Sequence, residues 1–180
     1  FDADKINGNL EIFLAKGGEN LKTLDEQDYK LSKEMIAIKD NKNLLSIAGV
    51  IGGVSSMCDL NTKNVFLESA YFDPVTIRKG AKYLGMSTES SKRFERGADP
   101  NGCVTAFWRI VDLVQELCDG KLASELTDAY NQKIPQPKIQ LESQRIDQLS
   151  GINISYIIYI HAATPTIKPT IAAIYPASPK

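Results

Sequence analysis

Residues 64–72, with the sequence NVFLESAYF, form an extended run with mostly nonpolar side chains on both faces. Alternate side chains of a strand point to opposite sides. The two faces are Val65, Leu67, Ser69 and Tyr71 on one side, and Phe66, Glu68, Ala70 and Phe72 on the other. Because neither face is polar, we expect both sides of this strand to be covered. Glu68 then becomes a carboxylate among aromatic and small apolar neighbours.

Two helices are predicted after this strand, each opened by an Asp-Pro pair. Asp73 and Asp99 are suitable N-caps, and a proline fits the first turn that follows. Gly85 and Gly120 are expected to end the two helices. The second helix carries an apolar stripe at helical spacing: Val104, Phe107, Trp108, Val111, Val114 and Cys118. We expect this stripe, with its aromatic pair, to pack in the core rather than to stack on bases.

Residues 1–63 are predicted to form short strands and turns. Strands are expected at 11–15, 35–38 and 44–50, and Gly52-Gly53 is expected to form a tight turn. With the two helices, this pattern predicts an α+β fold. A sheet-rich layer from the first 72 residues carries two or three packed helices in a module spanning residues 1–120.

The chain changes character after this module. Residues 121–138 are polar and contain spaced prolines, as a linker does. Residues 139–155 begin a new pattern and are expected to start an incomplete second domain. Residues 156–180 have no helical or strand period, so we expect an irregular or foreign tail there.

Composition excludes several kinds of site. The three cysteines are odd in number and lack metal-ligand spacing, so we expect reduced, mostly packed thiols and no metal. The only histidine, His161, lies in the unusual tail, so neither a histidine-based triad nor a site built from several histidines is expected in this segment. No apolar run is long enough to cross a membrane, and a cytoplasmic location is expected. Phe1 is neither an initiator Met nor part of a signal pattern, so a segment of a longer chain is expected.

Basic residues gather between positions 76 and 110, although the whole chain has a net charge of only −1. Seven basic and three acidic residues give this stretch a net charge of +4. Such a stripe is able to neutralise RNA phosphates. A solvated face of two helices is the alternative interpretation.

Three motifs between residues 47 and 101 carry a resemblance to a known family. They are Gly-x-x-Gly-Gly at 49–53, LESAYFDP at 67–74, and S-T-x-x-S-x-R-F-E-R-G-x-D-P at 87–100. In these motifs the chain resembles the β subunit of bacterial phenylalanyl-tRNA synthetases, and the resemblance extends over roughly residues 1–154. Residues 139–155 resemble the start of that subunit's winged-helix-like domain. Residues 156–180 depart from the family pattern, and the pocket histidine that the family has just before Phe1 is not in the chain.

The resemblance implies the editing region of the subunit, its third and fourth domains. This region hydrolyses tyrosine wrongly esterified to phenylalanine tRNA, which is needed where a pocket for Phe rejects the extra hydroxyl of Tyr too weakly. It also implies tRNA(Phe) and the synthetase α subunit as partners, in a heterotetramer of two α and two β subunits. ATP and Mg²⁺ are implied as cofactors of the parent synthetase, and none is expected in this segment.

The resemblance also assigns positions to a substrate pocket. Glu68 takes the position that reads the tyrosine hydroxyl. Gly52 and Gly53 match the glycine turn beside the pocket, and Thr88 and Ser90 match pocket-lining positions. No catalytic residue is assigned, because no nucleophile is evident and a phenol-binding role places Glu68 far from the ester.

Each of these assignments has a structural alternative. Glu68 is able to serve as a structural carboxylate paired with Arg93 or Arg96. The glycine pair is also typical of an ordinary hairpin turn, and the hydroxyls at 87–91 are also typical of helix caps.

Four basic residues are candidates for tRNA contacts: Lys79, Lys82, Arg93 and Arg96. Contacts to phosphates position a nucleic acid without reading its bases. For the two arginines a purely structural role is slightly favoured. A non-catalytic scaffold that docks tRNA is kept as the alternative function, because the chain lacks the family's pocket histidine before Phe1 and has a serine at position 90.

Overall fold

The computed structural model describes residues 1–130, 134, 143–151 and 170–176. Residues 131–133 and 135–138 of the expected linker, about half of the segment 139–155 and most of the tail, including His161, lie outside these residues. The expected α+β class is confirmed, since antiparallel sheets and helices pack together in the described part. No helix in that part has both the length and the apolar character to cross a membrane.

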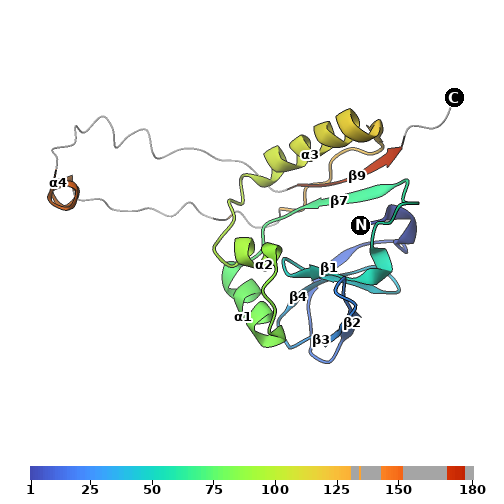
Figure 1. The fold of residues 1–180 in the computed structure, drawn as a ribbon, viewed down its shortest axis with the longest axis horizontal. Coiled ribbons are helices and arrows are strands. Elements are labelled where there is room, and N and C mark those ends of the chain that lie inside the picture. Colours follow the sequence, from blue (N-terminus) through green and yellow to red (C-terminus); the bar gives the residue numbers. More distant parts are fainter. Residues whose placement is uncertain (131–133, 135–142, 152–169, 177–180) are drawn as a thin grey trace.

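An antiparallel sheet of four strands forms one layer of the molecule (Figure 1). Its order is β1 (Glu11–Leu14), β4 (Ile36–Lys39), β5 (Leu44–Ile47) and β6 (Ile51–Gly52). A hairpin of β2 (Asn20–Lys22) and β3 (Asp28–Lys30) lies beside it. The three strands predicted between residues 11 and 50 are thus confirmed to within a few residues.

The predicted turn at Gly52-Gly53 is wrong, because the β5–β6 turn occupies residues 48–50. Gly49 lies at its centre with φ of 68°, a left-handed value that favours glycine. Gly52 instead pairs with Ser46 in the sheet. Gly53 donates its N–H to the Leu45 carbonyl at 2.7 Å, and an added Cβ there would lie 2.7 Å from that same carbonyl oxygen.

A second sheet contains β7 (Val65–Ser69), the strand predicted around Glu68. Its order is β7, β9 (Thr170–Pro176) and β8 (Gly120–Leu122), all antiparallel. The expectation of an irregular tail is therefore wrong for residues 170–176, and β8 takes the first two residues of the expected linker. Isoleucine, threonine and tyrosine favour strands, but the partners of β9 are distant in sequence, so no local period shows the pairing.

Helix α1 (Pro74–Leu84) begins and ends as predicted. The Asp73 carboxylate accepts the Thr76 N–H at 2.7 Å, and Gly85 ends the helix with φ of 65°. A short helix, α2 (Glu89–Phe94), follows, with Thr88 as its N-cap. The hydroxyls of Thr88 and Ser91 form a capping box, which confirms capping as one role of this hydroxyl-rich segment.

Helix α3 (Cys103–Cys118) starts later than the Asp99-Pro100 pair and ends earlier than predicted. The Asp99 carboxylate accepts the Asn101 N–H at 2.9 Å and so forms a turn ahead of the helix. Asp119, with φ of 51°, provides the left-handed cap, and Gly120 belongs to β8. A fourth helix, α4 (Ser143–Ser150), lies in the segment 139–155.

Two hydrophobic clusters stabilise the described part. The larger lies between the four-stranded sheet, α1 and Phe72 of the strand-to-helix junction. The smaller joins Phe107 and Val111 of α3 to Val65 and Leu67 of β7. The predicted stripe is therefore only partly a core: Trp108 is 41% exposed, and Cys118 is exposed as well. Of the three free cysteines, only Cys103 is buried, so packing was predicted wrongly for Cys58 and Cys118.

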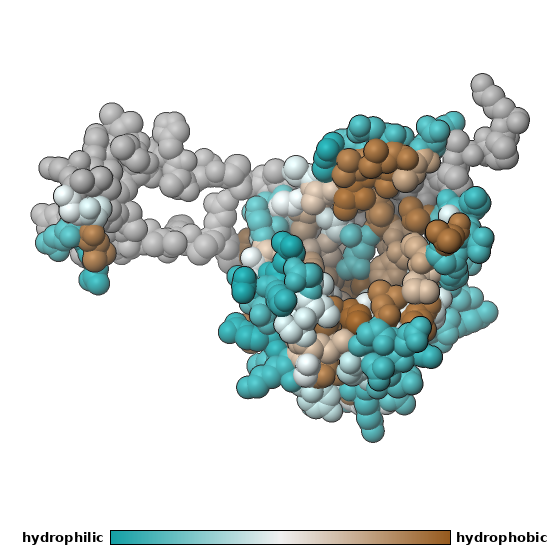
Figure 2. Space-filling model, viewed as in Figure 1, coloured by the Kyte–Doolittle hydropathy of each residue, from teal (hydrophilic) through white to brown (hydrophobic). Residues whose placement is uncertain are grey.

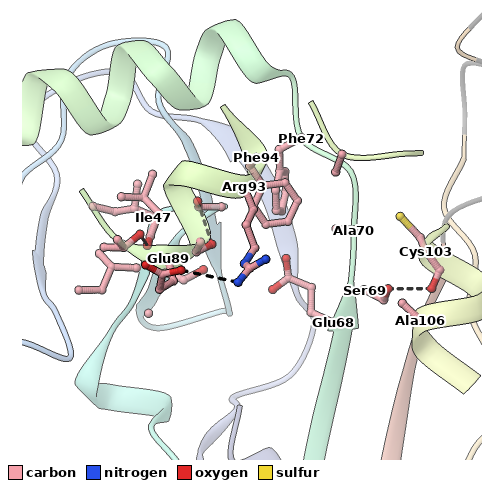
Figure 3. A pocket seen from close by; sticks show the side chains of 18 of the residues that line it. Ile47, Glu68, Ser69, Ala70, Phe72, Glu89, Arg93, Phe94, Cys103 and Ala106 are labelled. Carbon is pink, nitrogen blue, oxygen red and sulfur yellow. Dashed lines mark hydrogen bonds and ion pairs between the residues drawn. The ribbon is translucent and has the colours of Figure 1, made fainter. Parts of the chain in front are cut away.

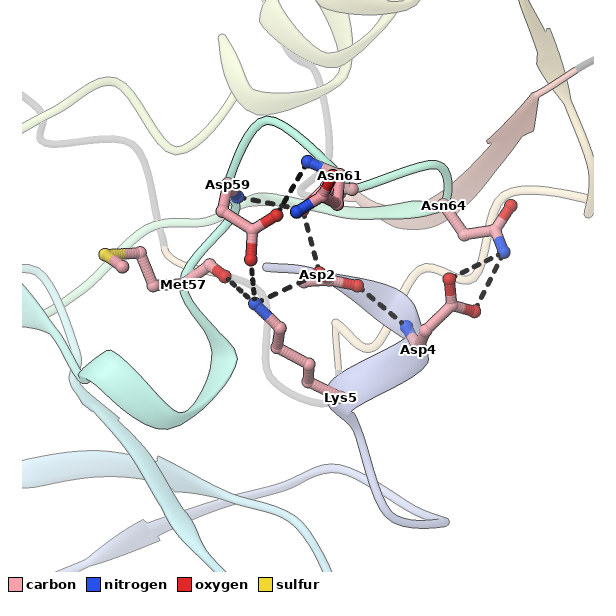
Figure 4. Close-up of polar contacts among 8 residues, drawn as sticks. Asp2, Asp4, Lys5, Met57, Asp59, Asn61 and Asn64 are labelled. Carbon is pink, nitrogen blue, oxygen red and sulfur yellow. Dashed lines mark hydrogen bonds and ion pairs between the residues drawn. The ribbon is translucent and has the colours of Figure 1, made fainter.

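A polar network holds the N-terminal turn η1 (Ala3–Lys5) against the loop that precedes β7 (Figure 4). Lys5 forms ion pairs with Asp59 at 2.8 Å and with Asp2 at 3.3 Å. Asn64 donates to the Asp4 carboxylate at 2.8 Å. This network fixes Phe1 beside β7, where the Phe66 N–H donates to the Phe1 carbonyl at 2.9 Å.

Candidate functional site

A cleft of about 870 Å³ opens between the two layers of the fold. One wall comes from β5, β6 and α2, and the other from β7 and the start of α3. The space-filling view shows the molecule hollowed between α3 and the lower sheet, with hydrophobic residues around the hollow (Figure 2). The volume falls within the range typical of small-molecule sites, so the cleft is large enough for an amino-acid side chain and more.

Glu68 lines this cleft from the middle of β7. Its side chain points away from α3, whereas that of Ser69 points toward α3 and donates to the Cys103 carbonyl at 2.8 Å (Figure 3). The predicted alternation along the strand is thus confirmed at these positions. All five residues of β7 are half-buried, which agrees with cover on both faces.

The Glu68 carboxylate makes no hydrogen bond or ion pair with any other described residue. Burial raises the pKa of this carboxyl to about 7, and the positive charge of the Phe1 amino group offsets only part of that rise. Apolar groups on its side of the strand include Ala70 and the edge-to-face ring pair Phe72 and Phe94. An acceptor in such surroundings favours a ligand that brings its own donor.

The alternative interpretation of Glu68 as a structural ion pair is not what the structure contains. Arg93 lines the cleft but pairs with Glu89, four residues earlier on α2, at 3.6 Å. Its side chain is 78% exposed. Arg96 is also exposed and does not line the cleft.

Three of the other four predicted pocket residues line the cleft: Gly52, Thr88 and Ser90. Thr88 donates its hydroxyl to the Val50 carbonyl at 2.7 Å, and Ser90 donates to the Gly49 carbonyl at 2.9 Å. These two bonds attach α2 to the β5–β6 turn, so both hydroxyl protons are used within the fold. Gly53 does not line the cleft, because it is buried against β5.

Ser46 is a cleft residue that sequence reasoning missed. It is buried in β5, and its hydroxyl has no hydrogen-bond partner among the described residues. In the sequence, a serine inside the run LLSIAGV indicates only a buried strand. Its lack of a partner becomes visible only when the sheet and the cleft are both in place.

Comparison with known proteins assigns the chain to a family. Residues 1–119 match the family model of the B3/4 domain. The chain belongs to the B3/4 domain family.

Among curated proteins, this B3/4 chain is similar to phenylalanine–tRNA ligase β subunits. It is 41% identical over 155 residues to that of Thermotoga maritima, which covers 86% of the chain and 20% of the relative. It is 39% identical to that of Fusobacterium nucleatum over 156 residues, covering 87% of the chain and 20% of the relative. The chain thus spans about a fifth of these relatives, and the predicted resemblance to synthetase β subunits is confirmed.

The candidate tRNA-contact residues of the B3/4 chain lie outside the cleft, apart from Arg93. Lys79 and Lys82 are exposed on α1, and Arg96 is exposed just after α2. Lys92 and Arg93 both pair with Glu89, so part of the predicted basic stripe is neutralised locally.

Cysteine and acidic side chains in the described part of the B3/4 chain are among the groups able to act as a nucleophile or to bind a metal ion. Cys103 lines the cleft, but burial raises the pKa of its thiol, which favours the unreactive protonated form. Across the described residues, no group of three or more histidine, cysteine, aspartate or glutamate side chains is placed to hold a metal ion.

Proposed function

We propose that this B3/4 domain hydrolyses tyrosine wrongly esterified to phenylalanine tRNA, as part of a cytoplasmic phenylalanine–tRNA ligase. The observation that carries the proposal is the Glu68 carboxylate, which faces the cleft without a partner. A phenol hydroxyl supplies the donor that this acceptor lacks. Phenylalanine leaves it unpaired, and an unpaired buried polar group costs about 1–3 kcal/mol.

In the proposed reaction, a water oxygen bonds to the ester carbonyl carbon while the bond from that carbon to the ribose oxygen breaks. The ribose oxygen takes up a proton, and free tyrosine and tRNA leave. Glu68 recognises the side chain and takes no part in proton transfer, because the phenol is the end of tyrosine farthest from the ester. The cleft contributes orientation of the ester and the water.

Hydrolysis of Tyr-tRNA(Phe) by a ligase whose β subunit contains this chain tests the proposal. Glu68→Ala is expected to lower kcat/KM for tyrosine release about tenfold or more, the effect of losing a hydrogen bond to a charged group. Glu11→Ala is the matched control, since Glu11 lies on the outer strand β1, away from the cleft, where it pairs with Lys39 of β4. Aminoacylation with phenylalanine is expected to be unchanged in both variants. Undiminished tyrosine release by Glu68→Ala contradicts the assignment.

A non-catalytic scaffold that docks tRNA is the second candidate, and the exposed Lys79 and Lys82 on α1 favour it. Under this alternative, Lys79→Glu with Lys82→Glu weakens tRNA binding and reduces its dependence on salt. Glu68→Ala then leaves proofreading intact, which distinguishes the two candidates.

A further inference from the structure

The hydroxyl of Ser46 stands out among the polar groups of the described residues. It is the one buried side-chain oxygen or nitrogen there that has no hydrogen-bond partner. Ser46 is 5% exposed and lies within β5, where its backbone pairs with Ile38 and Gly52. Burying a hydroxyl without a partner costs folding free energy, so its presence here needs a reason other than the stability of the sheet.

The side chain of Ser46 lies on the cleft side of its sheet. Residues paired directly across an antiparallel sheet point to the same face, and Ser46 pairs with Gly52. A Cβ added to Gly52 would lie 3.1 Å from a methyl group of Leu24. Ser46, Gly52 and Leu24 all line the cleft.

Most other hydrogen-bonding side chains that line the cleft are already engaged. Ser69, Thr88 and Ser90 donate to the carbonyls of Cys103, Val50 and Gly49. Glu89 pairs with Arg93, and Asp99 accepts the Asn101 N–H. Arg93, which lines the cleft and is 78% exposed, keeps further N–H groups beyond its one contact with Glu89. Among the hydroxyls and carboxylates that line the cleft, this leaves the Ser46 hydroxyl and the Glu68 carboxylate free for a ligand.

These two groups come from different walls of the cleft. Glu68 belongs to β7, and Ser46 belongs to β5 in the four-stranded sheet. Figure 3 shows Glu68 of β7 and Ile47 of β5 on opposite sides of the cleft. A tyrosyl ester likewise has a polar group at each end of an apolar ring.

We propose that Ser46 is a substrate-binding residue whose hydroxyl donates a hydrogen bond to the ester carbonyl oxygen of the bound aminoacyl group. This inference rests on the proposed function and adds a second anchor to the same site. The chemistry of the two groups assigns the ends. An ionised carboxylate only accepts, so Glu68 suits the phenol O–H, whereas the ester carbonyl only accepts and needs the donor that Ser46 supplies.

Ser46→Ala in the ligase that contains this chain tests the inference. We expect kcat/KM for tyrosine release to fall about threefold to tenfold, the effect of one neutral hydrogen bond. The ratio of Tyr-tRNA to Phe-tRNA hydrolysis is expected to stay the same, while Glu68→Gln changes that ratio. Ser55→Ala is the matched control: Ser55 is an exposed serine of the 3₁₀ turn Val54–Ser56, outside the cleft, and the variant is expected to retain wild-type rates.

Two further measurements separate binding from folding. The thermal midpoint of unliganded Ser46→Ala is expected to equal or exceed that of the wild type, because no hydrogen bond within the protein is lost. The affinity for 3′-(L-tyrosyl)amino-3′-deoxyadenosine, an amide that resists hydrolysis, is expected to fall in calorimetry.

Each contrary result overturns either the role assigned to Ser46 or the proposed function. Wild-type hydrolysis by Ser46→Ala, together with loss of tyrosine release by Glu68→Gln, removes the Ser46 assignment and leaves the proposed function standing. A changed Tyr-to-Phe ratio in Ser46→Ala shows that the hydroxyl serves the phenol end. A lowered thermal midpoint shows that Ser46 is structural. Wild-type ligase that releases no tyrosine removes both proposals together.

Discussion

At the scale of single residues, the cleft combines two groups that oppose folding. Glu68 is a half-buried acid without a hydrogen-bond or ion-pair partner among the described residues, and Ser46 is a buried hydroxyl without one. The hydroxyl protons of Thr88 and Ser90 are used in holding α2 to the β5–β6 turn. Residues of one cleft thus divide into those that build it and those that are free to bind. Because Glu68 has no partner in the described part of the fold, its effect on the free energy of unfolding is measurable without any substrate.

The stability of the chain is expected to depend on pH through Glu68. Burial raises the pKa of its carboxyl from 4.5 to about 7 in the folded state, so the folded protein holds this proton more tightly than the unfolded chain does. Between these two values the unfolded state binds fewer protons, and the contribution of Glu68 to stability falls as pH rises. The contribution of Glu68 to stability has its full value below about pH 4.5. It is lost as pH rises to about 7 and does not change further above that pH.

Glu68→Gln removes this penalty, because glutamine cannot ionise. At pH 8 we expect the variant to exceed the wild type by about 2 kcal/mol in free energy of unfolding, less than the full pKa change implies because cleft solvent screens the charge. At pH 5 the two proteins are expected to differ little. Urea denaturation at both pH values measures the effect, with Glu11→Gln as a control expected to change stability by less than about 1 kcal/mol. An equal difference at both pH values contradicts the expectation.

At the scale of elements, the β5–β6 turn joins the sheet to the helices. Gly49 lies in this turn, and a Cβ there would lie 2.8 Å from the terminal methyl of Ile77 on α1 and 3.0 Å from the ring of Phe72. The same residue gives its carbonyl to Ser90 of α2. A single backbone position therefore sets how closely α1, α2 and the sheet approach one another.

Gly49→Ala is expected to lower the free energy of unfolding by about 2–4 kcal/mol, since it combines left-handed strain with overpacking. Gly85→Ala provides a close control. Gly85 has nearly the same φ, 65° against 68°, but no atom lies within 4 Å of an added Cβ. It is expected to cost only about 1 kcal/mol. Thermal or urea unfolding of both variants compares them, and equal losses show that the close packing against Ile77 and Phe72 does not matter.

The sequence patterns predicted helices and strands more accurately than they predicted the contacts between residues. Asp73, Pro74 and Gly85 specify α1 through local hydrogen bonds and backbone preferences, and the structure confirms both of its ends. The start of α3 was wrong because the Asp99 side chain forms its own turn. Strand β9 was missed because its partners lie far away in the chain. Local rules describe local energies, and these two features depend on competing or distant contacts.

At the scale of the whole molecule, β7 and the residues that directly follow it join two hydrophobic clusters. Val65 and Leu67 pack against α3 in the smaller cluster, whereas Ala70, just beyond the strand, packs against the larger one. The sequence predicted that Glu68 shares a face with apolar residues, but not that a second sheet would face it across a cleft. Ser46 shows the same limit, since its role depends on what lies across the cleft. A strand held from both sides keeps Glu68 in a fixed position.

If β7 couples the two clusters, then damage to the smaller cluster must destabilise the whole described module. Phe107 is fully buried at the centre of that cluster, and Phe107→Ala is expected to cost about 3–5 kcal/mol. Leu117→Ala on the same helix is the control, because Leu117 is 72% exposed and is expected to cost less than about 0.5 kcal/mol. Fluorescence of Trp108, the only tryptophan, reports on α3, and far-ultraviolet circular dichroism reports on the whole chain. We expect both signals to change at the same, lower urea concentration in Phe107→Ala, as in one cooperative unit. Separate transitions show instead that α3 and β7 unfold without the larger cluster, and that the cleft has one wall able to move independently.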